Sequence, residues 1–271
     1  MIKELWQSRE LVFNLVKRDV KTRYKESVLG FFWSFMKPLL LMVILNLVFS
    51  NFVKLKLDND SIPYGLHLLC ALLPWIFFAG GLSEATNSIV ANSSLIKKVH
   101  TPNAVFPLSS ILANLFHFCM ALLVLFVFMI FYRVKPTLWI LLLPVVILIQ
   151  FIFIFGLSLI LSSLNVFFRD VSSLLEVGLT AWFYLCPIIY PIYMVKEMKG
   201  TLWYILYMLN PMAVIIALYR RILLYPAFNE TEIPDSDMKY FLIIALIVSL
   251  LLYFIGRMVF EHYSKSFADE V

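Results

Sequence analysis

Residues 138–164 read LWILLLPVVILIQFIFIFGLSLILSSL, a stretch of 27 residues without a charged side chain. A helix of about 20 mostly apolar residues crosses a hydrocarbon core about 30 Å thick, so this stretch is long enough to span a membrane. Five more apolar stretches complete a set of six predicted transmembrane helices: Phe31–Val53, Leu66–Ala91, Ala104–Tyr132, Leu138–Leu164, Leu174–Tyr193 and Tyr240–Phe260. The sequence therefore predicts an all-α integral membrane protein.

The composition supports this fold class. Of the 271 residues, 62% are hydrophobic and 14% are charged, whereas a soluble domain carries roughly 25% charged residues. These figures exclude a soluble enzyme and a disordered chain. Cys70, Cys119 and Cys186 lie within apolar runs and have no metal-ligand spacing, so we expect buried thiols and neither a disulfide scaffold nor a metal site.

Residues 1–30 are predicted to form a cytoplasmic amphipathic interface helix. Lys17, Lys21 and Lys25 share a basic stripe. Apolar side chains recur at three- and four-residue intervals on another stripe: Phe13, Val16, Val20, Tyr24 and Val28. Such a helix suits the plane of a membrane surface, and a solvated helix that caps a soluble partner is the alternative. Basic residues before an apolar run are typical of a cytoplasmic flank, so the net charge of +5 does not indicate a nucleic-acid partner.

We predict that residues 31–260 form the transmembrane domain and that both termini are cytoplasmic. The first apolar run begins near Val28 and lacks a small-residue cleavage site, so a cleaved signal peptide is not expected. Six spans then return the tail, residues 261–271, to the cytoplasm. Within the outer segment, residues 194–239, the apolar stretch Leu202–Tyr219 is interrupted by Asn210-Pro211. Because proline breaks a helix, two short re-entrant helices are predicted there instead of a seventh span.

The second predicted span changes from apolar to polar after Gly80-Gly81, where a kink is possible. Its polar half contains Ser83, Glu84, Thr86, Asn87, Ser88 and Asn92. Polar side chains at membrane depth face protein or a water-filled cavity. Glu84 is the most costly of them to bury, and we expect it either to line a transport path or to form a structural ion pair or helix cap.

Few residues are candidates for chemistry. No glycine lies in the phosphate-binding pattern of a nucleotide-binding loop, and the histidines are scattered, so this chain is expected to bind no cofactor and no metal. Glu84, Glu176 and His117 lie within predicted spans, and a membrane-embedded transferase that acts on a lipid-linked sugar would have to use them.

Three short segments on the predicted cytoplasmic side indicate a soluble partner. They are Leu95–Pro102, Asn165–Val171, and Arg18-Asp19 together with Arg23-Tyr24. Each combines charged and apolar residues in a short loop or basic helix. Exposed aromatic residues such as Phe167 and Phe168 need a partner or a lipid interface.

These segments belong to a longer ordered set of motifs. The set comprises Arg18-Asp19, Arg23-Tyr24, Ser27-Val28-Leu29-Gly30, Trp33, Lys37-Pro38-Leu39, Asn92, Leu95-Ile96-Lys97-Lys98-Val99, Pro102, Pro107, Leu164–Val171, Pro187-Ile188-Ile189-Tyr190, Asn210-Pro211 and Phe267-Ala268-Asp269. In this order, over essentially the whole chain, it resembles the ABC type-2 permeases that export polysaccharides and teichoic acids. Thr101 departs from the family pattern, which usually has phenylalanine before the proline.

The resemblance implies a bacterial plasma (inner) membrane permease that moves a lipid-linked polysaccharide or teichoic acid to the periplasm or cell exterior. Two identical permease subunits would pair with two ABC ATPase subunits, which bind the ATP and Mg²⁺. Residues that would couple to the ATPase are Leu95, Ile96, Lys97, Lys98, Val99, His100, Thr101, Asn165, Phe168, Arg169 and Asp170. An outer gate would form around Pro187, Tyr190, Asn210 and Pro211.

Two hypotheses concern the substrate. Lys17, Lys21, Arg23 and Lys25 would attract the phosphate of the lipid-linked glycan, because each cation near an anionic surface contributes about 1 kcal/mol. Side chains that would line the path through a homodimer are Phe35, Phe49, Phe183, Tyr184 and Glu84. Besides the transferase, the remaining alternative is a permease of the same fold for a drug or a small lipid.

Overall fold

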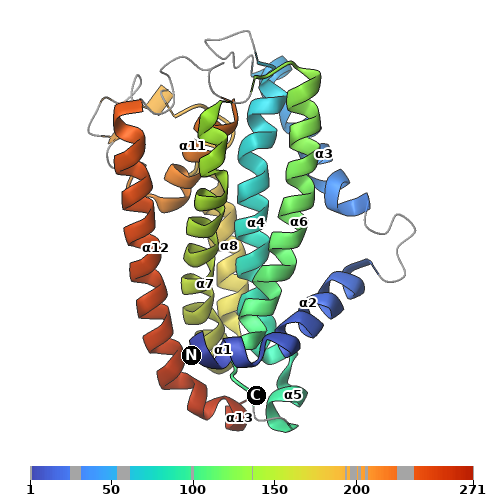
Figure 1. Ribbon diagram of the computed structural model, residues 1–271, viewed down its shortest axis with the longest axis vertical. Helices are drawn as coiled ribbons and strands as arrows, with labels where there is room; N and C mark the ends of the chain where they lie inside the picture. The colour runs from blue at the N-terminus through green and yellow to red at the C-terminus, as the bar shows by residue number, and fades with distance from the viewer. Residues whose placement is uncertain are drawn as a thin grey trace.

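The computed structural model describes residues 2–24, 32–53, 62–98, 101–135, 137–192, 194–195, 200, 203–204, 207–224 and 235–270. Every regular element within these residues is helical. Long helices stand side by side in a bundle, and short helices lie across its ends (Figure 1).

The regular elements of the described residues are helices of very different length. In chain order they are α1 (Ile2–Gln7), α2 (Arg9–Tyr24), α3 (Trp33–Asn46), the π-helical η2 (Leu47–Phe52), α4 (Tyr64–Ala91), α5 (Ser93–Lys98), α6 (Val105–Phe131), η3 (Leu138–Leu142), α7 (Leu143–Phe167), α8 (Asp170–Tyr184), α11 (Pro211–Leu224), α12 (Asp235–Tyr263), η4 (Ser264–Ser266) and α13 (Phe267–Glu270). Helices α1, α2, α5 and α13 gather at the lower end of Figure 1, which we call the basal end.

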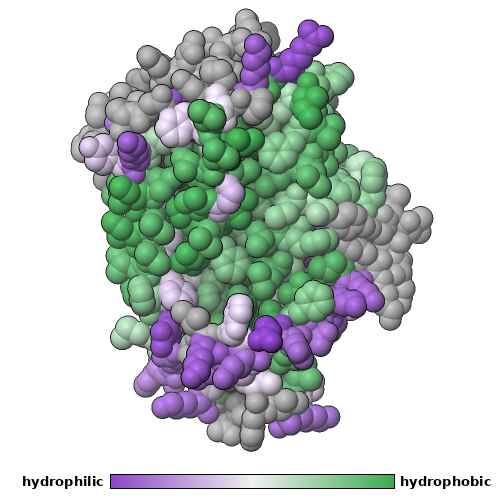
Figure 2. All heavy atoms as spheres, in the orientation of Figure 1, coloured by the Kyte–Doolittle hydropathy of each residue, from purple (hydrophilic) through white to green (hydrophobic). Residues whose placement is uncertain are grey.

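Four helices among the described residues are long and apolar enough to cross a membrane: Tyr64–Ala91, Val105–Phe131, Leu138–Phe167 and Asp237–Ser266. They coincide with the second, third, fourth and sixth predicted spans. The chain is therefore a multi-pass membrane protein. A broad hydrophobic band covers the visible face between hydrophilic side chains at the two ends, as expected for a bundle in a bilayer (Figure 2).

The other two predicted spans are shorter in the structure. The first corresponds to the helical run formed by α3 and η2, whose apolar part is Phe35–Ser50. The fifth, predicted over Leu174–Tyr193, is α8, which ends at Tyr184. Its 15 residues rise about 22 Å, less than the 30 Å core of a bilayer. Pro187 and Pro191 lie in the remainder of the predicted span and account for its early end, because proline cannot donate the backbone hydrogen bond of a helix interior.

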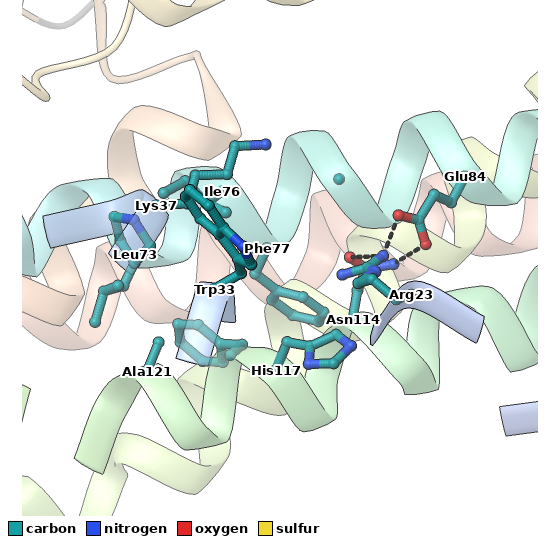
Figure 3. Close-up of a pocket in the computed structure, with 13 residues that line it drawn as sticks. Arg23, Trp33, Lys37, Leu73, Ile76, Phe77, Glu84, Asn114, His117 and Ala121 are labelled. Carbon is teal, nitrogen blue, oxygen red and sulfur yellow. Dashed lines mark hydrogen bonds and ion pairs between the residues drawn. The ribbon is translucent and has the colours of Figure 1, made fainter. Parts of the chain in front are cut away.

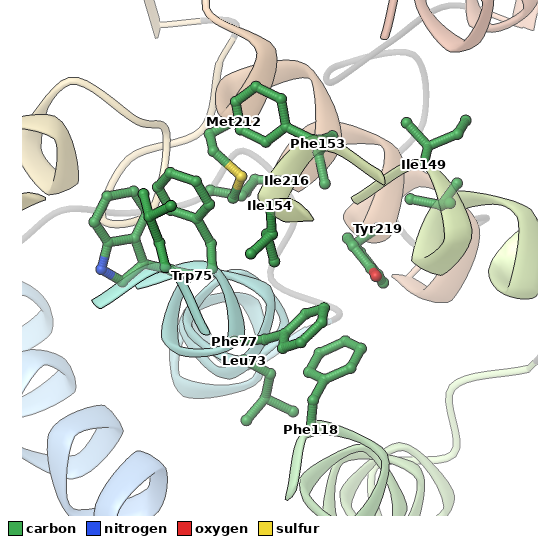
Figure 4. Packing of buried hydrophobic residues seen from close by; sticks show 14 of the residues in the cluster. Leu73, Trp75, Phe77, Phe118, Ile149, Phe153, Ile154, Met212, Ile216 and Tyr219 are labelled. Atoms are coloured by element: carbon green, nitrogen blue, oxygen red, sulfur yellow. The ribbon is translucent and has the colours of Figure 1, made fainter. Parts of the chain in front are cut away.

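Helix α4 forms the centre of the bundle. In its most apolar stretch 78% of the residues are buried, against 17% for α12 at the periphery. Aromatic side chains join α4 to its neighbours, as Phe77 stacks on Phe118 of α6 at 5.1 Å and Phe78 stacks on Phe153 of α7 at 5.6 Å. Tyr219 of α11 meets Phe118 edge-on, so α11 closes the same core (Figure 4).

Glycines permit a close crossing of α7 and α12. A Cβ atom on Gly156 would lie 2.6 Å from the backbone nitrogen of Tyr253, and Gly256 faces the carbonyl oxygen of Gly156 from the other side. Small residues at such crossings let two backbones approach within a membrane. This crossing fixes α12, whose other faces are largely exposed.

Helix α4 runs without interruption through Gly80-Gly81, where the sequence allowed a kink. A Cβ atom on Gly80 would lie 3.0 Å from Oδ1 of Asn114. The glycine thus makes room for a polar side chain of α6 beside the α4 backbone.

Candidate functional site

Helix α2 lies across the basal end and is tied to the bundle by its arginines. Its buried residues are Val12 and Leu15, whereas Phe13, predicted on the apolar stripe, is 67% exposed. Nη1 of Arg18 donates a hydrogen bond to Oδ1 of Asn92 at 2.9 Å, and Nη2 of Arg18 pairs with Asp19 at 2.9 Å. Arg18 therefore connects α2 to the residue that follows α4.

The second connection is a three-residue network within the bundle. Nη2 of Arg23 pairs with Oε1 of Glu84 and donates to Oδ1 of Asn114 at 3.3 Å. Nδ2 of Asn114 donates to the other carboxylate oxygen of Glu84 at 2.7 Å and to the carbonyl of Ser110 at 2.9 Å. The interface helix is thereby joined to α4 and α6 (Figure 3). Glu84 forms the ion pair that was one of its two expected roles.

This network closes one end of a cavity of about 490 Å³ between α2, α3, α4 and α6. Charged and polar residues at the cavity include Arg23, Lys37, Glu84 and His117, and apolar residues include Phe77. Trp33 and Lys37 reach it from α3, across from the side chains of α4 and α6 (Figure 3). Glu176 is not among the lining residues, so the three candidates for catalysis do not converge here.

Helix α5 presents a charged surface at the basal end. Ile96 is buried, Leu95 is half-buried, and Lys97 and Lys98 are exposed. Thr101 follows half-buried, while Val99 and His100, predicted in the same coupling segment, lie outside the described residues. The helix is anchored by Ile96, and its two lysines are exposed.

The C-terminal segment packs against α5 at the basal end. Helix α13 packs against both α5 and α7, and its first residue, Phe267, is fully buried between Phe260 at 5.4 Å and Phe167 at 6.4 Å. Nδ2 of Asn103, just before α6, donates to the carbonyl of Ser264 at 3.2 Å. The tail therefore fixes the position of the predicted coupling segment.

The turn between α7 and α8 divides into a buried part and an exposed part. Phe168, Arg169 and Asp170 are exposed. Asn165, predicted among them, is buried, and its Nδ2 donates to the carbonyl of Thr86 at 3.2 Å and to Oδ1 of Asn87 at 3.3 Å. In this structure Asn165 joins α7 to α4 and does not lie on the surface.

Asn210 organises the opposite end of α8. Its Oδ1 accepts hydrogen bonds from the backbone nitrogen of Met212 at 3.1 Å and from Nε1 of Trp182 at 2.9 Å, and its Nδ2 donates to the carbonyl of Leu185 at 3.1 Å. Asn210 is thus the N-cap of α11, with Pro211 at the first helical position, where its missing N–H costs nothing.

The turn after α8 is held by hydrogen bonds to its carbonyl groups. Nη2 of Arg220, a buried residue of α11, donates to the carbonyl of Ile188 at 2.7 Å, and the hydroxyl of Tyr64 donates to the carbonyl of Ile189 at 2.6 Å. The hydroxyls of Tyr190 and Tyr207 lie 3.0 Å apart. Because a buried carbonyl without a partner is costly, these bonds stabilise a non-helical segment inside the protein.

The comparison with known proteins decides the family. Residues 10–224 match the model of the ABC-2 type transporter family, from the second residue of α2 to the last residue of α11. The chain belongs to the ABC-2 type transporter family. The chain of this ABC-2 transporter is 32% identical over 271 residues to the O-antigen export system permease protein RfbA of Myxococcus xanthus, covering 100% of this chain and 99% of that protein. It is 32% and 33% identical over 261 residues to two proteins of the same name from Klebsiella pneumoniae, covering 96% of this chain and 94% of each relative.

The remaining predicted residues of the ABC-2 transporter chain are distributed over α2, α3, η2, α8 and the turn after α8. Lys17 and Lys21 are exposed on α2, and Lys25 lies outside the described residues. Phe35 and Phe49 are half-buried on α3 and η2. On α8, Phe183 meets Trp75 at 5.7 Å, and Tyr184 is exposed. Pro187 of the predicted outer gate is buried, and Tyr190 is half-buried.

Sequence reasoning missed several residues that organise the ABC-2 transporter chain: Asn114, Trp182, Tyr207 and Arg220. Phe267 was part of the motif set, but its packing role was not predicted. A polar or charged residue within an apolar stretch was the available signal for Asn114 and Arg220. Their partners lie 30 to 32 residues away, and no periodicity connects such positions.

Proposed function

We propose that this chain is the transmembrane permease subunit of an ATP-driven exporter that moves a lipid-linked polysaccharide of the O-antigen class out of the cytoplasm. The observation that carries the proposal is the similarity, over nearly the full length of each chain, to relatives named O-antigen export system permease proteins. Teichoic acid is a second substrate of the same chemical class, a polymer on a lipid phosphate. The chain is a transport subunit, and a separate ABC ATPase supplies ATP hydrolysis.

In the proposed complex, two copies of the permease pair with two ATPase subunits. Helix α5 is the coupling element, because its exposed Lys97 and Lys98 stand on a buried Ile96. The Phe168–Asp170 turn lies nearby on the ATPase-facing surface. ATP with Mg²⁺ is bound by the ATPase, and its closure pushes on α5 and biases the permease between two states.

The proposed membrane arrangement has six passes in a bacterial plasma (inner) membrane. The run of α3 with η2 and the short helix α8 complete the six. Residues 194–239, which include α11, contribute a pair of short re-entrant helices that enter the membrane from the outside. The basal end is cytoplasmic, and the exposed Lys17 and Lys21 of α2 attract the substrate phosphate at the inner leaflet. Aromatic side chains of α3, η2 and α8 contact sugar rings along the path.

The test is affinity purification of the tagged chain from native membranes, with identification of the proteins that accompany it. We expect an ATPase with a nucleotide-binding loop at one-to-one stoichiometry. Its recovery should fall at least tenfold in the double variant Lys97→Glu, Lys98→Glu. The matched control, Arg133→Glu with Lys135→Glu at the opposite end, should retain it.

Depletion of the chain identifies the cargo, since cells that lack the exporter should accumulate the lipid-linked glycan. Recovery of the chain without an ATPase, under conditions that keep other transporters intact, would contradict the proposal and favour the membrane-embedded transferase.

A further inference from the structure

The cavity between α2, α3, α4 and α6 contains more positive than negative charge. Arg23 and Glu84 neutralise each other. Lys37 also lines the cavity, and it forms no ion pair or hydrogen bond with any residue that the structure describes. A cation within a membrane span is costly unless it meets an anion or water. Lys37 therefore marks a place where an anion would be stabilised.

Arg23, which lines the same cavity as Lys37, has unused hydrogen-bond donors. Both of its bonds within the described part of the chain come from Nη2, which leaves Nε and Nη1 as donors. A guanidinium carries five N–H donors and an ammonium carries three. Together Arg23 and Lys37 can serve an anion with several acceptor oxygens, while Arg23 keeps its bonds to Glu84 and Asn114.

The cavity has a charged rim and an apolar floor. Its exposed lining residues are Arg23, Trp33, Lys37 and Glu84. The floor is formed by buried Leu73, Phe77, Phe118 and Ala121. From Glu84 to Leu73 it extends 11 residues along α4, about 16 Å at the rise of an α-helix. A volume of about 490 Å³ lies within the roughly 300–1,000 Å³ that is usual for ligand sites.

We propose that this cavity binds a phosphate-bearing lipid, with the phosphate on Lys37 and Arg23 and part of the hydrocarbon chain along the floor. A phosphate ester offers several acceptor oxygens in one group, which suits two cations of different geometry. An apolar floor at membrane depth suits a lipid chain and not a free phosphate ion. Two lipids share this chemistry, an anionic phospholipid of the bilayer and a polyprenyl phosphate carrier. Only the second assignment rests on the proposed function.

The test is native mass spectrometry of the purified chain in detergent with added lipid. Polyprenyl phosphate, phosphatidylglycerol, zwitterionic phosphatidylcholine and uncharged polyprenol are compared at equal concentration. We expect the wild-type chain to retain at least one of the two anionic lipids selectively. If polyprenyl phosphate is the ligand, it should be retained at least tenfold more than polyprenol. If phosphatidylglycerol is the ligand, it should be retained at least tenfold more than phosphatidylcholine. Retention should fall about tenfold in Lys37→Gln, which removes the cation, and in Ala121→Phe, which fills the floor.

Two variants control for general effects. Lys135→Gln removes an exposed charge outside the cavity, and Leu123→Phe enlarges a side chain on the exposed face of the same helix, α6. Both should bind as the wild type does. Equal retention by Lys37→Gln and the wild type would overturn the proposal, even if Ala121→Phe failed to fold. Equal retention of charged and uncharged lipids would also overturn it.

Comparison of the two anionic lipids shows whether the bound lipid is the transported carrier or a lipid of the bilayer. Selective retention of polyprenyl phosphate identifies the site with the transported carrier, and equal or greater retention of phosphatidylglycerol identifies a site for a bilayer lipid. Either result supports a phosphate-bearing lipid. Recovery of the ATPase is measured separately. If the chain recovers its ATPase but shows no selective lipid binding, that result contradicts only this inference and leaves the proposed function intact.

Discussion

Asn210 joins three parts of the chain through one side chain, the start of α11, Trp182 of α8 and the carbonyl of Leu185. Asn210→Ala removes an N-cap worth about 0.5–2 kcal/mol and leaves the Trp182 indole N–H without its partner, which costs about 1–3 kcal/mol when buried. We therefore expect a lower melting temperature in detergent. Asn210→Asp keeps the acceptor oxygen, so its melting temperature should lie between those of Asn210→Ala and the wild type.

The matched control for this residue is Asn14→Ala on the exposed face of α2, which should melt as the wild type does. Equal melting temperatures for Asn210→Ala and Asn14→Ala would contradict the role assigned to Asn210. The Asn-Pro pair predicted the break before α11, because that signal is local. Trp182 lies 28 residues earlier, and only the folded packing of α8 against α11 brings it within reach.

At the scale of elements, the crossing of α7 and α12 depends on backbone approach. A Cβ atom on Gly156 would lie 2.6 Å from the nitrogen of Tyr253 and 2.7 Å from the carbonyl carbon of Leu252. Gly156→Ala must push the two helices apart, and overpacking of this kind costs about 1–3 kcal/mol. Thermal unfolding in detergent should therefore begin at a lower temperature.

Gly178 of α8 provides the control, because nothing lies within 4 Å of the position of its Cβ atom. Gly178→Ala should leave stability unchanged or raise it by up to about 1 kcal/mol, since alanine favours a helix over glycine. A melting temperature for Gly156→Ala at or above that of Gly178→Ala would show that the crossing tolerates a methyl group.

Helix α13 packs against the proposed coupling helix α5. Phe267, the first residue of α13, is fully buried against Phe167 and Phe260, and truncation of a buried phenylalanine to alanine costs about 3–5 kcal/mol. Because α13 is a helix of only four residues, we expect the loss to loosen it locally. Recovery of the proposed ATPase partner should decline several-fold in Phe267→Ala. Phe254→Ala, on the exposed face of α12, should not change the recovery of the ATPase. Equal recovery in Phe267→Ala and Phe254→Ala would show that α13 does not contribute to coupling.

The face of α2 shows where sequence periodicity reaches its limit. Two overlapping stripes of α2 contain apolar residues, which are Leu11, Val12, Phe13, Leu15, Val16 and Val20. The stripe through Phe13 was predicted to suit a membrane surface, and it is the neighbouring residues Val12 and Leu15 that are buried where α2 contacts α6. The helix itself was predictable because its period is local. Its orientation depends on Arg18 and Arg23 meeting partners on other helices.

At the scale of the whole molecule, four of the predicted spans were identified correctly, because a long apolar run in a membrane protein has few alternatives to a helix. The fifth was misjudged because apolar residues continue past Tyr184 into a segment with two prolines. Hydropathy alone cannot tell such a segment from a helix when it is buried in protein and its carbonyls are bonded by Arg220 and Tyr64. The same limit applies to the cavity, which four separate helices build.

The arrangement of two copies can be argued from the exposed faces of α8 and α12. On α12 the exposed side chains at membrane depth, Ile247, Leu251, Phe254 and Met258, are apolar and suit lipid. On α8 the polar residues Glu176 and Thr180 lie exposed among apolar ones, which is costly against hydrocarbon. We therefore expect α8, and not α12, to face the second copy of the proposed homodimer or a water-filled path between the copies.

Cysteine cross-linking in membranes tests this arrangement. Val177 on α8 and Met258 on α12 are similarly exposed, at 71% and 73%. In a background that carries Cys119→Ser, because Cys119 is the exposed native thiol among the three, oxidation should link Val177→Cys into a covalent dimer and leave Met258→Cys monomeric. The distinction follows from chemistry, since a disulfide forms only where two Cα atoms approach within about 7 Å. Cross-linking through Met258→Cys alone would place α12 at the dimer contact and leave the polar residues of α8 to another partner.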